Sequence, residues 1–562
     1  MAKTRKALGE SLVEEGIITA DQFKAVQAEE KKTGQRFRDI LVKTGLIAEE
    51  DLVTFLSDKM GLPRIELGNY LIDPKIVELV PEVLARKYEL IPVLKIGNRL
   101  TCAMADPWNI FALDEIRMKT GLIIEPAVAT ESEIKKAMNQ YYGAKGTVED
   151  LIKSMDEGKL GIKEAGFDAK KLKGIVEEPV VIKLVNLIIM KAVQERASDI
   201  HIEPEEEVLK TRFRVDGMLH ESSSPPKYLQ SAVISRIKIM ANLDIAERRK
   251  PQDGRFSLKA EGRGIDVRVS CMPTIYGENV VLRLLDASSA LLGLDQLGFS
   301  KAILNEYNKL ITRAYGIILV TGPTGSGKTT TLYASLDKIN TREKNIVTIE
   351  DPVEYKLPGI RQIQVDTNVG LTFANGLRSI LRQDPDIIMV GEIRDLETAE
   401  IAIQAALTGH LVYSTLHTND ATSAVTRMID MGVEPFLVSS SVVGILAQRL
   451  VRKICEGCKE KYEPTEEMLK DIGLSKKQSV AFYRGKGCPK CMNTGYKGRI
   501  SIYELMLPDD KIRNAIVAKS QADEIRKLAR STGMITLMED GVEKVKAGIT
   551  TVEEVLRVTR EE

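Results

Sequence analysis

The chain lacks an excess of charge of either sign, and it has no long apolar run. Its 562 residues include 80 lysines and arginines against 80 aspartates and glutamates, so the net charge gives no global reason to expect nucleic acid or an anionic membrane as a partner. No basic stretch interleaved with aromatic residues occurs, which disfavours a DNA-moving role. No uninterrupted run of about 18 apolar residues occurs, which argues against a membrane span.

The first residues show none of the features of an export signal. The segment MAKTRK at 1–6 leads into amphipathic sequence instead of an apolar core, so we expect no secretory signal. We therefore expect a soluble, cytoplasmic protein, a location that still allows docking on a membrane partner.

Cysteine is scarce, and four of the six cysteines form two C-x-x-C pairs. In a reducing compartment this pattern favours a metal over a disulfide, and the chain between the pairs is long enough to close a tetrahedral zinc site that folds an insertion. Redox dithiols and idle thiols are the alternatives. The other two, Cys102 and Cys271, are expected to be packing residues. The four paired residues are Cys455, Cys458, Cys488 and Cys491.

What the chain does contain is a phosphate-binding loop. Residues 322–330 read GPTGSGKTT and complete the pattern G-x-x-x-x-G-K-[ST], between an apolar strand predicted at 317–320 and a helix predicted from 330. The glycines let backbone N–H groups face a phosphate at the positive end of that helix. A glycine-rich turn that matches by chance is the alternative. The predicted nucleotide-binding residues are Gly322, Pro323, Thr324, Gly325, Ser326, Gly327, Lys328, Thr329 and Thr330.

The side chains of this loop add charge and a metal ligand. Lys328 is predicted to reach the β- and γ-phosphate oxygens, and the hydroxyl of Thr329 to bind Mg²⁺. Guanine specificity usually shows an N-K-x-D element after the loop. The nearest approach, NKLI at 308–311, lacks the aspartate and precedes the loop, so ATP is favoured over GTP.

Two other apolar strands end in carboxylates. The run IIMVGE at 387–392 has the Walker B pattern, and Glu392 is predicted to hold Mg²⁺ through water. The run IVTIEDPVE at 346–354 ends in Glu350, Asp351 and Glu354, any of which can accept a proton from water. A solvated turn is the usual place of such an acid, but the series of motifs favours catalysis.

His417 is one of only four histidines and lies in STLHTND at 414–420, after another apolar run. We expect it to sense the γ-phosphate by hydrogen bonding, with a purely structural role as the alternative.

The order of these patterns predicts several segments. LGESLVEEGII at 8–18 aligns with FRDILVKTGLI at 37–47, which predicts a paired helical module. A stretch rich in Lys, Glu, Asp and Gly predicts a flexible linker. The predicted segments are a helical repeat module at 1–60, a small α/β domain at 61–142, the linker at 143–177, a second α/β domain at 178–288, and the nucleotide domain at 289–562 with a Cys₄ insertion at 450–500.

Together the motifs resemble the secretion ATPase family, on the phosphate loop, IEDPVE at 349–354, the atypical Walker B and TLHTNDA at 415–421. Within that family the chain is similar to the type IV pilus assembly (extension) ATPases over nearly its whole length. The stretches that carry this similarity are ASDIHIEP at 197–204, IKIMANLDIAERR at 237–249, PQDG at 251–254 and LRQDPDIIMVGEIRD at 381–395.

The resemblance implies an α/β fold, with a RecA-like P-loop nucleotide domain and a PAS-like second domain. It also implies a homohexamer, cytoplasmic and docked peripherally at the inner membrane, in which ATP hydrolysis moves the second domains and turns a membrane platform protein to add pilin subunits. Its extension and type II secretion members carry the cysteine insertion and its retraction members lack it, which favours extension. A type II secretion ATPase and a nucleotide-gated scaffold with little turnover are the alternatives.

Individual site residues follow from the resemblance. Glu354 corresponds to the glutamate that polarises water, and is preferred to Glu350 because the family places this base at the last acid of the motif. Arg268 and Arg283 correspond to arginines brought from the second domain towards ATP, a role that suits the fixed charge and fork geometry of a guanidinium. An arginine that merely faces water is the alternative for each. Lys328, Glu392 and His417 complete the predicted catalytic set.

The N-terminal repeat resembles a module that binds cyclic diguanylate in some relatives. Gly9 and Arg36 are kept, but the chain departs from the pattern at Ala7, Glu30, Arg38 and Lys59. Docking of cytoplasmic pilus-assembly proteins is therefore favoured over dinucleotide binding for this module.

Overall fold

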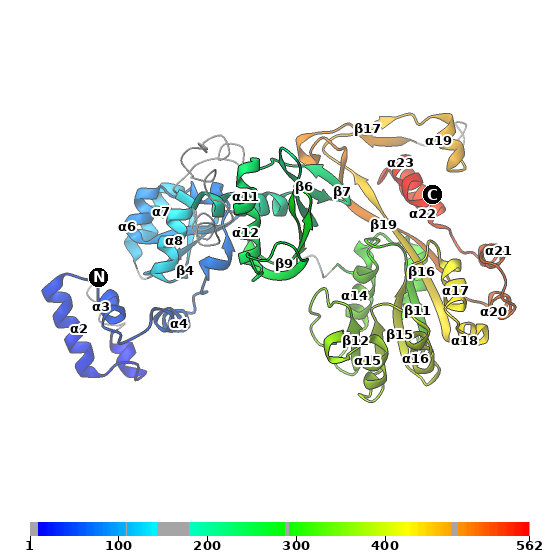
Figure 1. The fold of residues 1–562 in the computed structure, drawn as a ribbon, viewed down its shortest axis with the longest axis horizontal. Helices are drawn as coiled ribbons and strands as arrows, with labels where there is room; N and C mark the ends of the chain where they lie inside the picture. Colours follow the sequence, from blue (N-terminus) through cyan, green and yellow to red (C-terminus); the bar gives the residue numbers. More distant parts are fainter. Residues whose placement is uncertain (1–8, 108, 143–178, 287–291, 475–480, 561–562) are drawn as a thin grey trace. The chain divides into compact units, whose positions relative to one another are not determined.

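The computed structural model describes residues 9–107, 109–142, 179–286, 292–474 and 481–560, in two units that meet in sequence at residues 287 and 288 (Figure 1). The predicted linker at 143–177 and Ala7 lie outside the described residues. Among the described helices, none is long and apolar enough to cross a membrane. The predicted α/β class is confirmed.

The first unit begins with helices, followed by a small three-stranded sheet in the order β2-β3-β4. Strands β2 and β3 pair antiparallel and β3 and β4 pair parallel. Glu49 fastens the early helices to this sheet, because its carboxylate accepts hydrogen bonds from the N–H groups of Glu131 at 2.6 Å and Ser132 at 3.2 Å, at the start of α8. The elements are α2 (Ala20–Thr33), α3 (Phe37–Lys43), α4 (Glu49–Met60), η1 (Leu67–Asn69), β1 (Tyr70–Leu71), α5 (Pro74–Val77), α6 (Glu82–Tyr88), β2 (Leu90–Ile96), β3 (Arg99–Met104), α7 (Ile110–Thr120), β4 (Ile123–Val128) and α8 (Glu131–Tyr142).

A seven-stranded sheet in the order β1-β8-β9-β10-β5-β6-β7 forms the rest of this unit. Alternate residues such as Ile200, Phe213 and Val267 are buried in one core with residues of α11 and α12. The residues between them point to the other face, as the period of two requires. The elements are α11 (Pro179–Gln194), β5 (Asp199–Pro204), β6 (Leu209–Val215), β7 (Met218–Glu221), η3 (Lys227–Leu229), α12 (Gln230–Met240), β8 (Gln252–Ala260), β9 (Arg263–Thr274) and β10 (Gly277–Asp286).

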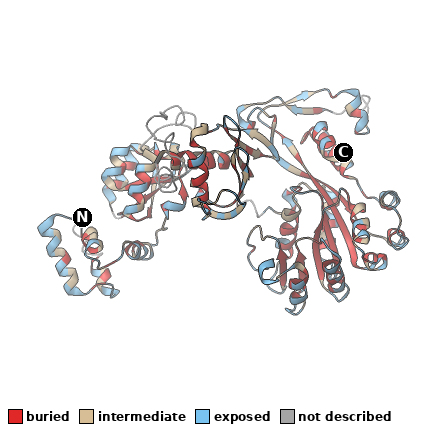
Figure 2. Cartoon of the chain, in the orientation of Figure 1, coloured by how far each residue is buried: buried red, intermediate tan, exposed pale blue. Residues whose placement is uncertain are grey.

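The second unit contains a seven-stranded sheet in the order β13-β12-β14-β15-β11-β16-β19, parallel except for β19. Its central strands are buried throughout, as expected when helices cover both faces (Figure 2). The elements up to the last parallel strand are η5 (Leu294–Gln296), α13 (Lys301–Ile311), β11 (Gly316–Thr321), α14 (Lys328–Ile339), β12 (Ile346–Glu350), β13 (Arg361–Gln364), η6 (Thr367–Val369), α15 (Phe373–Ile380), β14 (Ile387–Val390), α16 (Leu396–Leu407), β15 (Leu411–Leu416), α17 (Ala421–Asp430), α18 (Pro435–Ser441) and β16 (Val442–Ile454).

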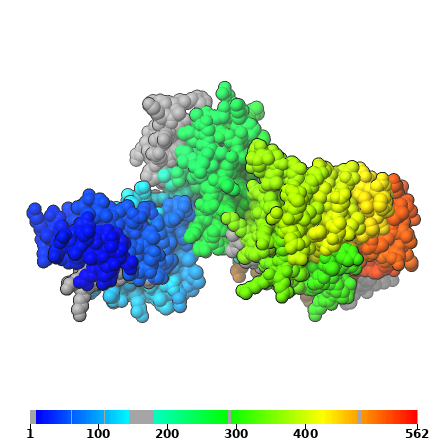
Figure 3. Space-filling view, turned by 90° about the horizontal axis from the view of Figure 1, so that it is seen from below, coloured from blue at the N-terminus to red at the C-terminus, as the bar shows by residue number. Residues whose placement is uncertain are grey.

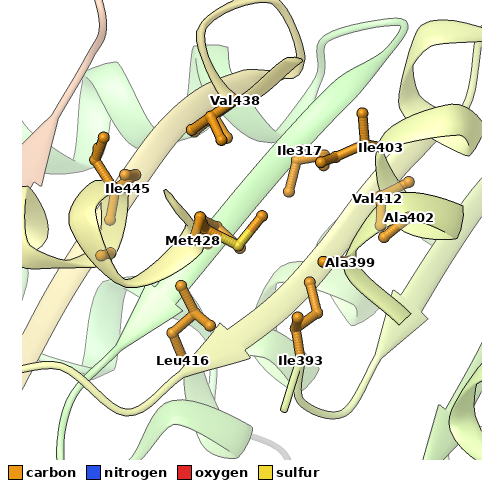
Figure 4. Packing of buried hydrophobic residues seen from close by; sticks show 14 of the residues in the cluster. Ile317, Ile393, Ala399, Ala402, Ile403, Val412, Leu416, Met428, Val438 and Ile445 are labelled. Atoms are coloured by element: carbon orange, nitrogen blue, oxygen red, sulfur yellow. The ribbon is translucent and has the colours of Figure 1, made fainter. Parts of the chain in front are cut away.

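Successive residues of each central strand enter different cores. Ile317 and Leu319 of β11 belong to one core, and Ile318 and Val320 belong to another. Figure 4 shows the first of these cores, where residues of α16, α17 and α18 such as Ile403, Met428 and Val438 pack over residues of β11, β15 and β16. This packing fixes the sheet on which the loops at its edge are built.

The chain leaves the main sheet at the end of β16 and returns with β19, which begins at Tyr496. Residues 450–454 and 496–500 of the predicted insertion therefore belong to strands of the main sheet, and the two-stranded β17–β18 element lies between them. Residues Leu469 and Phe482 pack with Val545 and Val555 of the C-terminal helices in one core. Figure 3 shows the green-to-orange part of this unit as one continuous surface. The remaining elements are β17 (Lys459–Tyr462), α19 (Glu466–Asp471), β18 (Phe482–Gly485), η7 (Pro489–Cys491), β19 (Tyr496–Met506), α20 (Asp510–Val517), α21 (Ala522–Ser531), α22 (Leu537–Lys546) and α23 (Val552–Thr559).

Candidate nucleotide site and cysteine cluster

The phosphate loop joins β11, which ends at Thr321, to α14, which begins at Lys328. Gly327 has a φ of +90° and forms the N-cap of α14, and a Cβ atom at Gly322 would lie 2.6 Å from the carbonyl oxygen of Gln448. Both positions therefore require glycine. The first N–H groups of α14 have no partner within the helix and face outwards, which is the arrangement that binds a phosphate.

Two polar groups of the loop suit an anionic ligand. The ammonium of Lys328 lies over the loop, where it donates to the carbonyl oxygens of Gly322 at 2.8 Å and Pro323 at 3.2 Å. Burial lowers the pKa of Lys328 to about 8, against the opposing effect of Glu392. The Ser326 hydroxyl is buried and has no hydrogen-bond partner among the described residues. A phosphate oxygen would satisfy both groups, so the loop fits a nucleotide.

Glu392 follows β14 and is held from two sides. Arg394 forms an ion pair with one oxygen of its carboxylate, and Nε2 of His417 lies 3.3 Å from the other. Only 14% of the Glu392 side chain is exposed, against 51% for His417. The structure thus brings the predicted Walker B acid and the predicted histidine together, at the edge where Lys328 also lies.

The acidic motif at the end of β12 contains two glutamates that differ in burial and in hydrogen bonding. Glu350 is buried and accepts hydrogen bonds from Thr348 at 2.6 Å, Gln362 at 3.1 Å and the Tyr333 hydroxyl, and burial raises its pKa. Glu354 is only partly buried, and its backbone N–H donates to the same Tyr333 hydroxyl at 3.3 Å. Glu350 therefore supports the local structure, while Glu354 is the more accessible acid.

The loops of this edge are fastened to each other. The Thr321 hydroxyl at the end of β11 lies 2.7 Å from the Thr418 hydroxyl and accepts the Thr418 N–H at 3.0 Å. The Thr415 hydroxyl donates to the carbonyl oxygen of Gly391 at 2.7 Å, just before Glu392. Because the carboxyl ends of parallel strands meet at one edge, these bonds connect the phosphate loop to the segments that carry Glu392 and His417.

The four paired cysteines lie together as predicted. Their sulfur atoms all fall within 4.8 Å of one another, with Cys455–Cys488 at 3.9 Å, Cys458–Cys491 at 3.8 Å and Cys488–Cys491 at 3.7 Å. A tetrahedral site with Zn–S bonds of about 2.3 Å places its sulfurs about 3.8 Å apart, so the cluster fits zinc. Cys102 and Cys271 are fully buried among apolar residues, as expected.

The predicted arginines lie in the first unit, on the open face of its larger sheet. Arg283 of β10 pairs in register with Arg268 of β9, which pairs with Arg255 of β8. On its other side Arg283 pairs with Asp199 of β5, and its Nε atom donates to Asp199 Oδ1 at 3.1 Å. The Arg283 side chain is 59% exposed. Contact of Arg268 or Arg283 with a nucleotide stays a prediction.

Three residues at the edge of the sheet that carries the phosphate loop were not predicted from the sequence. Tyr333 links Glu350 to the backbone of Glu354, Arg394 pairs with Glu392, and Gln448 bonds to the phosphate loop from β16. Arg394 was detectable, because it lies two residues after the Walker B acid. Tyr333 and Gln448 give no local signal, since each acts on a segment distant in sequence.

The fold and this edge define a P-loop nucleotide-binding protein of the α/β class. The sequence model of the type II/IV secretion system protein family matches residues 175–557, and that of the MshEN domain matches residues 60–148. The chain belongs to this family of secretion and pilus ATPases, and it is an ATP hydrolase.

Similarity to individual members extends along the whole chain. It is 47% identical over 554 residues to the type IV pilus assembly ATPase PilB of Myxococcus xanthus, covering 98% of both chains. It is 44% identical to the type II secretion system protein E of Xanthomonas campestris, covering 100% of this chain and 99% of that protein. The structure of the Legionella pneumophila ATPase DotB has the same fold over 66% of this chain and 94% of its own, with a TM-score of 0.50 and 22% identity.

Proposed function

We propose that the chain is a motor ATPase that drives type IV pilus extension as a homohexamer, in the cytoplasm at an inner-membrane platform protein. The observation that carries this proposal is that one edge of the sheet brings together the phosphate loop, Glu354, Glu392 and His417. The cysteine cluster and the full-length similarity to a pilus assembly ATPase support extension.

In this proposal each residue at this edge of the sheet has its own role in ATP hydrolysis. The backbone of the loop and Lys328 hold the phosphates, Thr329 and Glu392 hold Mg²⁺, the latter through water, and Glu354 accepts the proton of the attacking water. Bound Mg²⁺ supplies positive charge that neutralises the phosphate oxygens. Glu392 keeps its orientation through Arg394 and His417. Arg268 and Arg283 add the positive charge that the transition state requires.

Substitution of Glu354 tests the chemistry. Glu354→Gln keeps the size of the side chain but cannot accept the proton, so we expect kcat to fall by about 1000-fold with little change in KM. The matched control is Glu350→Gln, which we expect to lower the melting temperature and to retain much more activity, because Glu350 is bonded to Thr348, Tyr333 and Gln362. An unchanged rate in Glu354→Gln removes that residue from its role.

The type II secretion ATPase is the second candidate, because a relative of that name matches the full chain at 44% identity. The membrane protein that co-purifies with the full-length chain separates the two. A pilus platform protein supports the proposal, and a secretion platform protein supports the alternative. Metal analysis of the same preparation is expected to give about one zinc per chain, and its mass in solution is expected to be that of a hexamer.

For the N-terminal module we propose docking of cytoplasmic pilus-assembly proteins. Arg36, which the dinucleotide-binding pattern shares, forms an ion pair with Glu89. Arg38 donates to the carbonyl oxygen of Ala105 and lies 3.8 Å from Glu49. Both guanidinium groups are thus engaged within the protein. Calorimetry of the full chain with cyclic diguanylate tests this view, and sub-micromolar binding would overturn it.

A further inference from the structure

Strand β16 extends past the end of β11 and runs beside the phosphate loop. The last residue of β11, Thr321, pairs in register with Ala447. The next residue of β16 is Gln448, whose side chain is completely buried. Its position therefore coincides with the point where the loop leaves the sheet.

The side-chain amide of Gln448 forms hydrogen bonds both to the phosphate loop and to the helix that follows it. Its Nε2 donates to the carbonyl oxygen of Ser326 at 2.6 Å, and its Oε1 accepts from the hydroxyl of Thr331 at 2.8 Å. Thr331 is itself buried in the first turn of α14. One amide thus connects the last part of the loop to the start of the helix.

Gln448 also restricts which residues fit at two positions of the loop, through its backbone and its side chain. Its carbonyl oxygen would lie 2.6 Å from a Cβ atom at Gly322, and its Nε2 would lie 3.0 Å from one at Gly327. The loop therefore packs directly against this residue at its beginning and at its end. A loop in contact at both ends has less freedom to rearrange when it is empty, which lowers the entropy cost of binding phosphate.

We infer that Gln448 is a positioning residue for the nucleotide phosphates, which holds the phosphate loop in its binding conformation through Ser326 and Thr331. The inference rests on the proposed function, because it deepens the role of the same site. It predicts a loss that appears mainly in nucleotide affinity, since the loop already contacts the phosphates in the ground state.

The test uses the full-length protein with MgATP and MgADP. In Gln448→Leu, which keeps the approximate volume but neither hydrogen bond, we expect KM for MgATP and Kd for MgADP to rise about tenfold while kcat changes much less. The matched control is Gln404→Leu on the exposed surface of α16, which is expected to leave all three values unchanged.

Variants of Thr331 test the same contact from its other side. Thr331→Ser keeps the hydroxyl and is expected to bind MgADP as the wild type does, whereas Thr331→Val is expected to bind it about threefold more weakly. The double variant Gln448→Leu/Thr331→Val should lose less affinity for MgADP than the two single losses multiplied together. The reason is that both substitutions remove the same hydrogen bond between Gln448 and Thr331. If Gln448→Leu fails to fold, the comparison of Thr331→Ser with Thr331→Val still tests the inference.

The outcomes are distinct. A lowered melting temperature with KM and Kd within about twofold of the wild type makes Gln448 a residue of the core only and overturns the inference, while the proposed function stands. Additive losses, or equal binding by Thr331→Val and Thr331→Ser, also overturn it. A wild-type protein that binds neither MgATP nor MgADP contradicts the proposed function, and the inference with it.

Discussion

Two carboxylates, one in each unit, lie between a pair of arginines, yet their surroundings differ. Glu554 of α23 accepts from Arg452 at 2.6 Å and from Arg557 at 2.8 Å, and only 2% of its side chain is exposed. Asp199 accepts from Arg283 at 3.1 Å and lies 3.6 Å from Arg214, and only 10% of its own side chain is exposed, but the Arg283 side chain is 59% exposed against 16% for Arg452. The same pairing can therefore fasten a core in one place and present a guanidinium to solvent in another.

The difference follows from the two sheets. Arg452 belongs to β16 of a sheet covered on both faces, so its contact with Glu554 joins that strand to the C-terminal helices. Arg283 belongs to the open face of the sheet in the first unit, where Arg268 and Arg255 continue the row. Removal of one partner from the buried pair should therefore cost much stability, whereas removal of an exposed arginine from the row should cost little.

The largest expected effect is on stability, at Glu554. Burial alone would raise its pKa, but hydrogen bonds from Arg557 and Arg452 lower the pKa of Glu554 to about 2. Glu554→Gln leaves Arg452 without its charged partner, so we expect the free energy of unfolding to fall by about 3 kcal/mol with nucleotide affinity unchanged. Chemical denaturation measures this, with the exposed neighbour Glu553→Gln as the matched control. A loss no larger than that of the control contradicts the buried role.

The same pair predicts a dependence on pH. The folded pKa of Glu554 is about 2, below its ordinary value of 4.5. Its stabilising contribution is therefore complete above about pH 4.5 and is lost as the pH falls towards 2. We expect the free energy of unfolding of the wild type to fall more steeply over this range than that of Glu554→Gln. If the free energy of unfolding depends on pH in the same way in both proteins, the Glu554 carboxylate is not the source of the pH dependence.

The next effect concerns the exposed row. The proposed role of Arg283 brings one fixed charge to the phosphoryl group, so in Arg283→Ala we expect kcat to fall by about 100-fold, with a change in melting temperature much smaller than that of Glu554→Gln. Arg268→Ala is expected to behave alike. Steady-state ATPase kinetics measure both, with Arg255→Ala as a control from the same row. Wild-type rates in both Arg283→Ala and Arg268→Ala would show that these arginines only face the solvent.

Much of this organisation was predictable from the sequence, because it is local. The phosphate loop, the carboxylates after apolar strands and the C-x-x-C pairs each lie within a few residues, so their chemistry shows in the order of the residues. Gln448 and the row from Arg255 to Asp199 were not predictable, because strand pairing between distant segments creates them. Alternation along β10 indicates that Arg283 faces outwards, but only the register reveals Asp199 beside it.

The smallest effect is expected at Asp199, and it decides whether the row is held in place. In Asp199→Asn the side chain keeps its size and loses the charge that orients Arg283, so we expect kcat to fall about fivefold, with a smaller loss of stability than in Glu554→Gln because Arg283 and Arg214 keep access to water. Glu203→Gln is the matched control, because Glu203 lies on the same strand and holds Arg212 through two bonds of 2.7 Å. The loss at Asp199 should vanish in the Arg283→Ala background, since the two residues then share one interaction. A loss that persists there would mean that Asp199 acts on the sheet and not through Arg283.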